Sequence, residues 1–95
     1  MSIETIGIIG GTHGLGARFV DYFQTRFPSK TILFSGRGTA MTNQMIVEQS
    51  DLVIFSVPIE VTVEVIESML PFSRKDQIWM DFTSIKKEPL SLIHI

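Results

Sequence analysis

The chain has 95 residues and a formal net charge of −2, with 44% hydrophobic and 19% charged residues. This length supports one small domain, which we place at residues 1–95. The near-neutral charge argues against nucleic acid as a partner, and no apolar run approaches the roughly 20 residues that span a membrane. Without cysteine or clustered histidines no metal site is expected. Without a basic, signal-like N-terminus a cytoplasmic location is predicted.

Strands and helices alternate along the chain. Short β-branched and apolar runs predict strands at residues 3–9, 31–35, 52–57 and 77–82. Alternation of this kind requires right-handed crossovers and a parallel sheet. We therefore expect a doubly wound α/β sheet of about four strands, with helices on both faces. We expect the strands that begin at Thr31, Ile3, Leu52 and Gln77 to lie side by side in that order.

Apolar residues three or four positions apart predict the intervening helices. The first carries a stripe of Leu15, Phe19, Phe23 and Phe27, and a weaker helix is expected over residues 42–49. In the third helix the residues expected to face inward are Val61, Val65, Ile66 and Met69. A last helix is expected to begin near residues 86–90.

A glycine-rich turn joins the first strand to the first helix. Its candidate cofactor-binding residues are Gly10, Gly11, Thr12, His13, Gly14, Leu15 and Gly16. The spacing departs from G-x-G-x-x-G, but the context predicts a Rossmann-like nucleotide-binding fold because backbone N–H groups at a helix N-terminus bind a pyrophosphate. We expect the N–H groups of residues 12–15, and the Thr12 hydroxyl, to face the phosphates. The alternative is a turn that only reverses the chain.

The end of the second strand decides which dinucleotide is preferred. An NAD site carries an acid about 20 residues beyond the glycines, to bind the adenosine ribose. This chain has Ser35, Gly36 and Arg37 there. A guanidinium and a hydroxyl suit a 2′-phosphate, which predicts NADP as the cofactor and leaves NAD as the alternative. Arg37 could otherwise be an ordinary exposed turn residue.

Two later strand ends lie at the edge where ligands bind in open parallel sheets. They are Ser56-Val57-Pro58, predicted to contact the cofactor, and the stretch Asp81-Phe-Thr-Ser84. Together with residues 8–16, the segments 51–62 and 81–86 resemble the prephenate and arogenate dehydrogenase family of tyrosine biosynthesis. The resemblance implies NAD- or NADP-dependent oxidative decarboxylation of prephenate or arogenate. It also implies that Ser84 orients the substrate and the nicotinamide, with Lys86 behind it. The alternative for Ser84 is a helix N-cap or turn residue.

The resemblance covers only the cofactor domain of that family. The family's catalytic histidine, in a His-Pro motif, and its helical substrate and dimerisation domain would follow after Ile95. His94 is not a substitute, because no proline follows it. We therefore expect these 95 residues to bind the dinucleotide without being catalytically complete, and to meet a small-molecule substrate only when a second domain is supplied.

Two other interpretations stay open. One is a different NADP-dependent reductase, since the glycine loop and the Ser-Arg segment also look similar to deazaflavin-dependent NADP reductases. The other is a non-catalytic nucleotide-binding or interaction module that docks through the helix from Val61 and the apolar tail of residues 90–95. Exposure of that tail would favour a homodimer.

Overall fold

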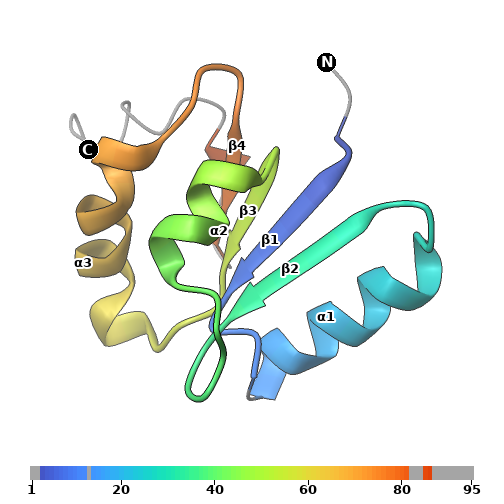
Figure 1. The fold of residues 1–95 in the computed structure, drawn as a ribbon. Helices are drawn as coiled ribbons and strands as arrows, with labels where there is room; N and C mark the ends of the chain where they lie inside the picture. Colours follow the sequence, from blue (N-terminus) through green and yellow to red (C-terminus); the bar gives the residue numbers. More distant parts are fainter. Residues whose placement is uncertain (1–2, 13, 82–84, 87–95) are drawn as a thin grey trace.

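The computed structural model describes residues 3–12, 14–81 and 85–86. Its centre is one sheet with the strand order β2-β1-β3-β4-β5 (Figure 1). The strands are β1 (Thr5–Ile9), β2 (Thr31–Ser35), β3 (Leu52–Phe55), β4 (Ile78–Met80) and β5 (Ile85–Lys86). The helices are α1 (Gly14–Arg26), α2 (Asn43–Gln49) and α3 (Ile59–Met69), followed by the 3₁₀ turn η1 (Leu70–Phe72).

The first four strands are parallel and have the predicted order, so the Rossmann-like fold is confirmed. Strands β1, β2 and β3 end at the same level, because Ile9 of β1 pairs with Ser35 of β2 on one side and with Phe55 of β3 on the other. The residues that follow these three strands therefore start from the same edge of the sheet.

The fifth strand corrects one prediction. Lys86 was expected near the start of a helix, but it lies in β5 and pairs antiparallel with Trp79 of β4. An edge strand has unpaired N–H and C=O groups that a following segment can pair with. Such pairing cannot be predicted from the periodicity of apolar residues along the chain. The other residues of the predicted helix lie outside the described residues.

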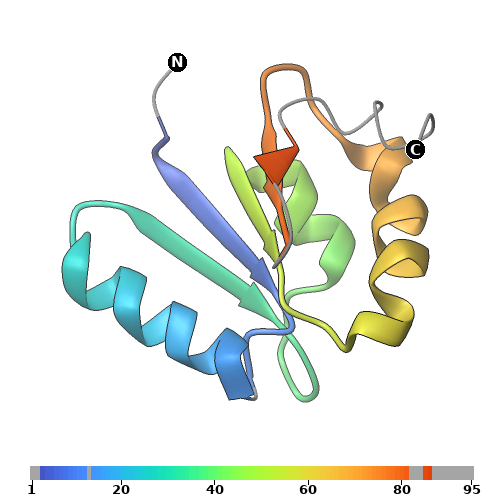
Figure 2. The same ribbon diagram turned by 180° about the vertical axis from the view of Figure 1, so that it is seen from behind.

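The core has two layers, one on each face of the sheet (Figure 2). Because side chains alternate along a strand, Ile9 of β1 faces α2 and α3, while its neighbour Ile8 faces α1. The layer beneath α2 and α3 contains the following buried side chains: Ile9, Ile46, Val47, Val53, Phe55, Ile66 and Trp79. The layer beneath α1 contains Ile6, Ile8, Val20 and Ile54.

The inward face of α3 differs from the prediction at one position. Val65, Ile66 and Met69 pack toward the core as expected, but Val61 is exposed. Apolar residues stand at every second position from Ile59 to Val65, a period that places them on both sides of a helix. Ile59 and Val63 are consequently 78% and 67% exposed.

The apolar stripe of α1 is also buried only in its middle. Phe19 and Phe23 pack against the layer beneath α1, whereas Leu15 and Phe27 are exposed. A repeat of four residues drifts around a helix that has 3.6 residues per turn, so the two ends of the stripe leave the buried face. Helix α2 begins as predicted at Thr42, whose hydroxyl accepts a hydrogen bond from the Met45 N–H at 3.2 Å.

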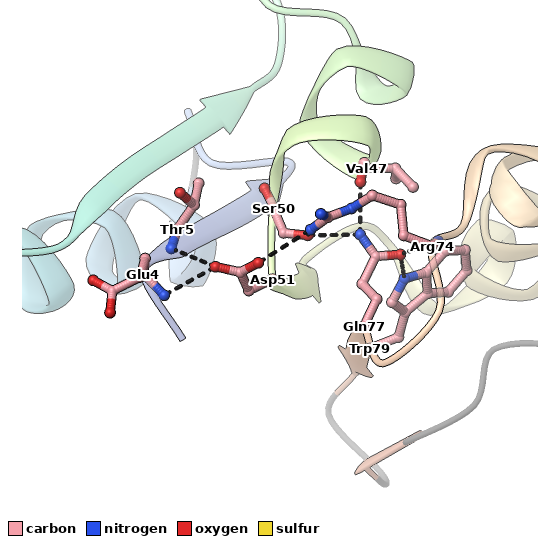
Figure 3. A network of polar contacts seen from close by, with 8 residues as sticks. All are labelled: Glu4, Thr5, Val47, Ser50, Asp51, Arg74, Gln77 and Trp79. Carbon is pink, nitrogen blue, oxygen red and sulfur yellow. Dashed lines mark hydrogen bonds and ion pairs between the residues drawn. The ribbon is translucent and has the colours of Figure 1, made fainter. Parts of the chain in front are cut away.

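A polar network links residues at the amino-terminal edge of the sheet, opposite the edge at which β1, β2 and β3 end (Figure 3). The Asp51 carboxylate accepts hydrogen bonds from the backbone N–H groups of Glu4 at 2.9 Å and Thr5 at 3.0 Å, and it forms an ion pair with Arg74. Those two backbone hydrogen bonds, followed by Arg74, lower the pKa of Asp51 below its ordinary value of 3.8. The carboxylate therefore fastens the start of β1 to the start of β3.

The same network continues into the core through Gln77. Its amide donates to the carbonyls of Val47 at 2.6 Å and Ser50 at 2.7 Å, and its own carbonyl accepts from the indole of Trp79 at 2.8 Å. Arg74 also donates to the Ser50 carbonyl. Gln77 and Trp79 are both buried, and these bonds satisfy polar atoms that would otherwise destabilise the core.

Candidate functional site

The glycine turn lies where the strand order reverses, at the carboxyl edge of the sheet. From β1 the chain passes through α1 to β2 on one side, and it returns through α2 to β3 on the other. The arrowheads of β1 and β2 meet beside the first turn of α1 in Figure 1. Open α/β sheets bind ligands at such a switch point.

Two glycines allow the first turn of α1 to approach the sheet. A methyl group at Gly16 would lie 2.9 Å from the carbonyl carbon of Gly10, and closer still to its oxygen. A methyl group at Gly10 would meet the Ser56 carbonyl in the same way, and Gly10 also has a φ of 87°. Only glycine fits both requirements at Gly10, so the turn brings α1, β1 and the end of β3 into backbone contact.

The turn is also fastened to the end of β2. The N–H groups of Gly10 and Gly11 both donate to the Ser35 carbonyl, at 3.1 and 2.8 Å. A methyl group at Gly11 would lie 2.7 Å from the Phe34 Cβ. The predicted turn and the predicted ribose-reading segment are therefore joined directly by backbone hydrogen bonds.

The first turn of α1 suits an anionic ligand. Gly14 and Leu15 are exposed there, and the first turn contains no acidic residue. Apart from its chain neighbours and the backbone of α1, no described atom lies within 4 Å of the place where a Gly14 side chain would start. The positive end of the helix dipole is thus not neutralised by a neighbouring carboxylate. A pyrophosphate fits this end of α1, because backbone can approach it without interference from side chains.

The two side chains predicted to bind a 2′-phosphate at the end of β2, Ser35 and Arg37, differ in their exposure. Arg37 is exposed in the turn after the strand. The Ser35 side chain is only 2% exposed, and its hydroxyl donates to the Asn43 carboxamide oxygen at 2.6 Å. The predicted contact of that hydroxyl with a 2′-phosphate is therefore replaced by an internal hydrogen bond that joins β2 to α2.

The sequence did not predict two residues that support the end of β2, Thr39 in the turn and Asn43 at the start of α2. Asn43 carries no motif, and only its place directly after the helix-capping Thr42 hints that it faces the strand end. Thr39 accepts a hydrogen bond from the Gly36 N–H at 3.1 Å, and its own N–H donates back to the Gly36 carbonyl at 3.3 Å. These contacts fix the backbone that presents Arg37.

The remaining candidates lie beside the turn or outside the described residues. The Ser56 N–H donates to the Ile9 carbonyl at 2.8 Å, Val57 stands next to Gly10, and the exposed Pro58 precedes α3 as its N-cap. His13, Ser84 and the apolar tail of residues 90–95 fall outside the described residues. Within the described part of the chain no acidic or histidine cluster suits a metal ion, and no helix is long and apolar enough to cross a membrane.

These features define a nucleotide-binding domain of the Rossmann type, with a glycine turn at the switch point and a level row of strand ends. The family model described as "Prephenate dehydrogenase, nucleotide-binding domain" matches residues 30–94. The chain belongs to this family, as its three motifs predicted. Membership implies a nicotinamide dinucleotide as the cofactor, and the glycine turn has the shape to hold one.

Two curated proteins are similar over most of the chain. It is 37% identical over 99 residues to the probable arogenate/prephenate dehydrogenase of Methanocaldococcus jannaschii, an alignment that covers 90% of this chain and 22% of that protein. It is 36% identical over 89 residues to the T-protein of Haemophilus influenzae, with 94% of this chain and 23% of that protein covered. The chain thus spans less than a quarter of the length of these relatives.

Proposed function

We propose that the chain is the NADP-binding domain of a prephenate or arogenate dehydrogenase, acting in the oxidative decarboxylation that leads to tyrosine. The observation that carries this proposal is the backbone connection between the glycine turn and the end of β2, with Arg37 exposed just after that strand. Support comes from the family match and from the name of the Methanocaldococcus jannaschii relative.

In this proposal each part of the edge has its own task. The backbone N–H groups at the start of α1 bind the pyrophosphate, and the Arg37 guanidinium pairs with the 2′-phosphate of the adenosine ribose. Ser56, Val57 and Pro58 line the way from the pyrophosphate toward the nicotinamide, where Ser84 orients the substrate. When bound, the dinucleotide supplies the hydride acceptor.

The 95 residues alone are proposed to bind the cofactor and to turn over prephenate or arogenate poorly. The proton of the substrate hydroxyl must be taken by a base within hydrogen-bond distance as the hydride leaves. We assign that base, and the contacts to the substrate, to the part of the relatives that lies outside the match with this chain. Ordinary steady-state turnover by the 95-residue chain with prephenate and NADP would overturn this assignment.

Calorimetric titration with NADP and with NAD tests the cofactor. Wild type should bind NADP more tightly, and Arg37→Gln should weaken NADP binding about tenfold to a hundredfold, because a charge-assisted pair is lost. NAD binding should hardly change. Arg26→Gln is the matched control, since Arg26 is exposed in the last turn of α1, at the other end from the glycines.

Three results would count against the proposal. Equal affinities of wild type for NADP and NAD would remove the argument from Arg37. The same loss of affinity for both cofactors in Arg37→Gln would show that Arg37 does not read the 2′-phosphate. Failure of wild type to bind either dinucleotide would refute the proposed function as a whole.

A further inference from the structure

Thr12 packs against the first residue after β2. A side chain beginning at Gly36 would place its Cβ 2.7 Å from the Thr12 Cγ2 and 3.1 Å from the Thr12 Cβ, with the hydroxyl oxygen nearer than either. Separations under 3.0 Å are not tolerated by real Cβ atoms. Thr12 therefore already fills the space in which any side chain at position 36 would stand. The structure places the Thr12 side chain beside the residue that follows β2, and its contact with the pyrophosphate stays a prediction.

The backbone on both sides of this contact is held in place. Gly36 is held by two hydrogen bonds with Thr39: its N–H donates to the Thr39 hydroxyl at 3.1 Å, and its carbonyl accepts from the Thr39 N–H at 3.3 Å. The residue before Thr12 is held by the 2.8 Å hydrogen bond from the Gly11 N–H to the Ser35 carbonyl. The register adds to this restraint, because Ile9 and Ser35 are paired across the two strands that carry the contact.

Position 36 lies in the segment from which an NAD site reads the ribose, and it is exposed whereas Ser35 before it is buried. It follows β2 directly and comes about 20 residues after the last glycine of the turn, where an acid binds the ribose hydroxyls. A carboxylate there would also repel the 2′-phosphate of NADP, since both groups are negatively charged. A contact that excludes a carboxylate from position 36 therefore bears on the choice between the two cofactors.

We propose that Thr12 and Gly36 determine cofactor specificity as a pair, because Thr12 occupies the position that a ribose-binding carboxylate at residue 36 would need. The proposal deepens the proposed function and rests on it for its link to NADP. Arg37 provides the attraction for the 2′-phosphate, and Thr12 blocks the competing arrangement. Discrimination between NADP and NAD then depends on an attractive contact from Arg37 and on steric exclusion by Thr12.

The test is a double-mutant cycle in the full 95-residue chain with Gly36→Asp, Thr12→Ala and the two combined. Gly36→Asp alone should weaken the binding of both cofactors, because the new side chain meets Thr12. Thr12→Ala removes the two nearest atoms and leaves only the 3.1 Å approach, which a shift of a few tenths of an ångström relieves. The double variant should thus regain binding and prefer NAD by about tenfold or more, while Thr12→Ala alone keeps the NADP preference.

A second measurement tests the steric contact without any cofactor. The urea midpoint of Thr12→Ala/Gly36→Asp should lie above that of Gly36→Asp, since the clash is relieved, and any backbone cost of the aspartate is common to both. Thr25→Ala/Gly36→Asp is the matched control and should show no such recovery, because Thr25 is exposed in α1.

The outcomes separate this inference from the proposed function. If wild type binds NADP but the double variant recovers neither stability nor NAD binding over Gly36→Asp, the role of Thr12 is refuted alone. If the double variant is more stable than Gly36→Asp but wild type binds neither dinucleotide, the contact between Thr12 and position 36 is confirmed. The proposed function is then refuted, and so is the role of Thr12 in cofactor selectivity.

Discussion

Gly16→Ala tests whether the close approach of α1 to the sheet forms the cofactor site. The new methyl group would lie 2.9 Å from both the Gly10 carbonyl carbon and the Ser56 hydroxyl oxygen, and closer to the Gly10 oxygen. Ordinary contacts need about 3.5 Å, so α1 must retreat by more than half an ångström. Overpacking of this kind costs about 1–3 kcal/mol, offset by about 1 kcal/mol of helix propensity. We expect a net loss of up to about 2 kcal/mol in the free energy of unfolding.

Urea denaturation followed by tryptophan fluorescence measures this loss, because the single tryptophan, Trp79, is fully buried. Calorimetry should show NADP binding weakened about tenfold or more, as the N–H groups of the first turn move away from the pyrophosphate. Ala17→Gly on the neighbouring residue is the control: it loses about 1 kcal/mol through helix propensity without a clash, and should bind NADP normally. Unchanged stability and affinity in Gly16→Ala, or equal weakening of binding in both variants, would refute the reasoning.

Two further predictions concern the amino-terminal edge of the sheet. Ser50→Ala should raise the free energy of unfolding by about 1 kcal/mol in urea titrations, because the buried Ser50 hydroxyl has no hydrogen-bond partner among the described residues; a loss of stability would contradict this. Asp51→Asn should destabilise the chain by about 1–3 kcal/mol at neutral pH, since two backbone N–H groups and Arg74 lose a charged acceptor. As the folded-state pKa of Asp51 is lowered, the difference between wild type and Asp51→Asn should be constant well above pH 3.8 and shrink as the pH falls below it. A difference that stays the same down to pH 3 would show that the carboxylate charge is not involved.

Much of the fold was predictable because it depends on local patterns and general rules of handedness. The β-branched runs located the four parallel strands to within about two residues. The strand order typical of dinucleotide-binding folds then predicted their arrangement, and the glycines after Ile9 indicated the switch point. The motif at residues 51–62 and the one at 81–86 pointed to the family that the comparisons confirm.

The sequence by itself determined which segments form strands and helices, where the glycine turn lies, and which edge of the sheet carries the site. Tertiary structure alone decided how single side chains are used there: Ser35 turns inward to Asn43, and Thr12 stands over Gly36. It likewise joined Asp51 to the start of β1, 46 and 47 residues away in the chain. The physical reason is that periodicity tells which face of an element a residue occupies, whereas hydrogen bonds and steric exclusion depend on distances between elements that meet only after the sheet has formed.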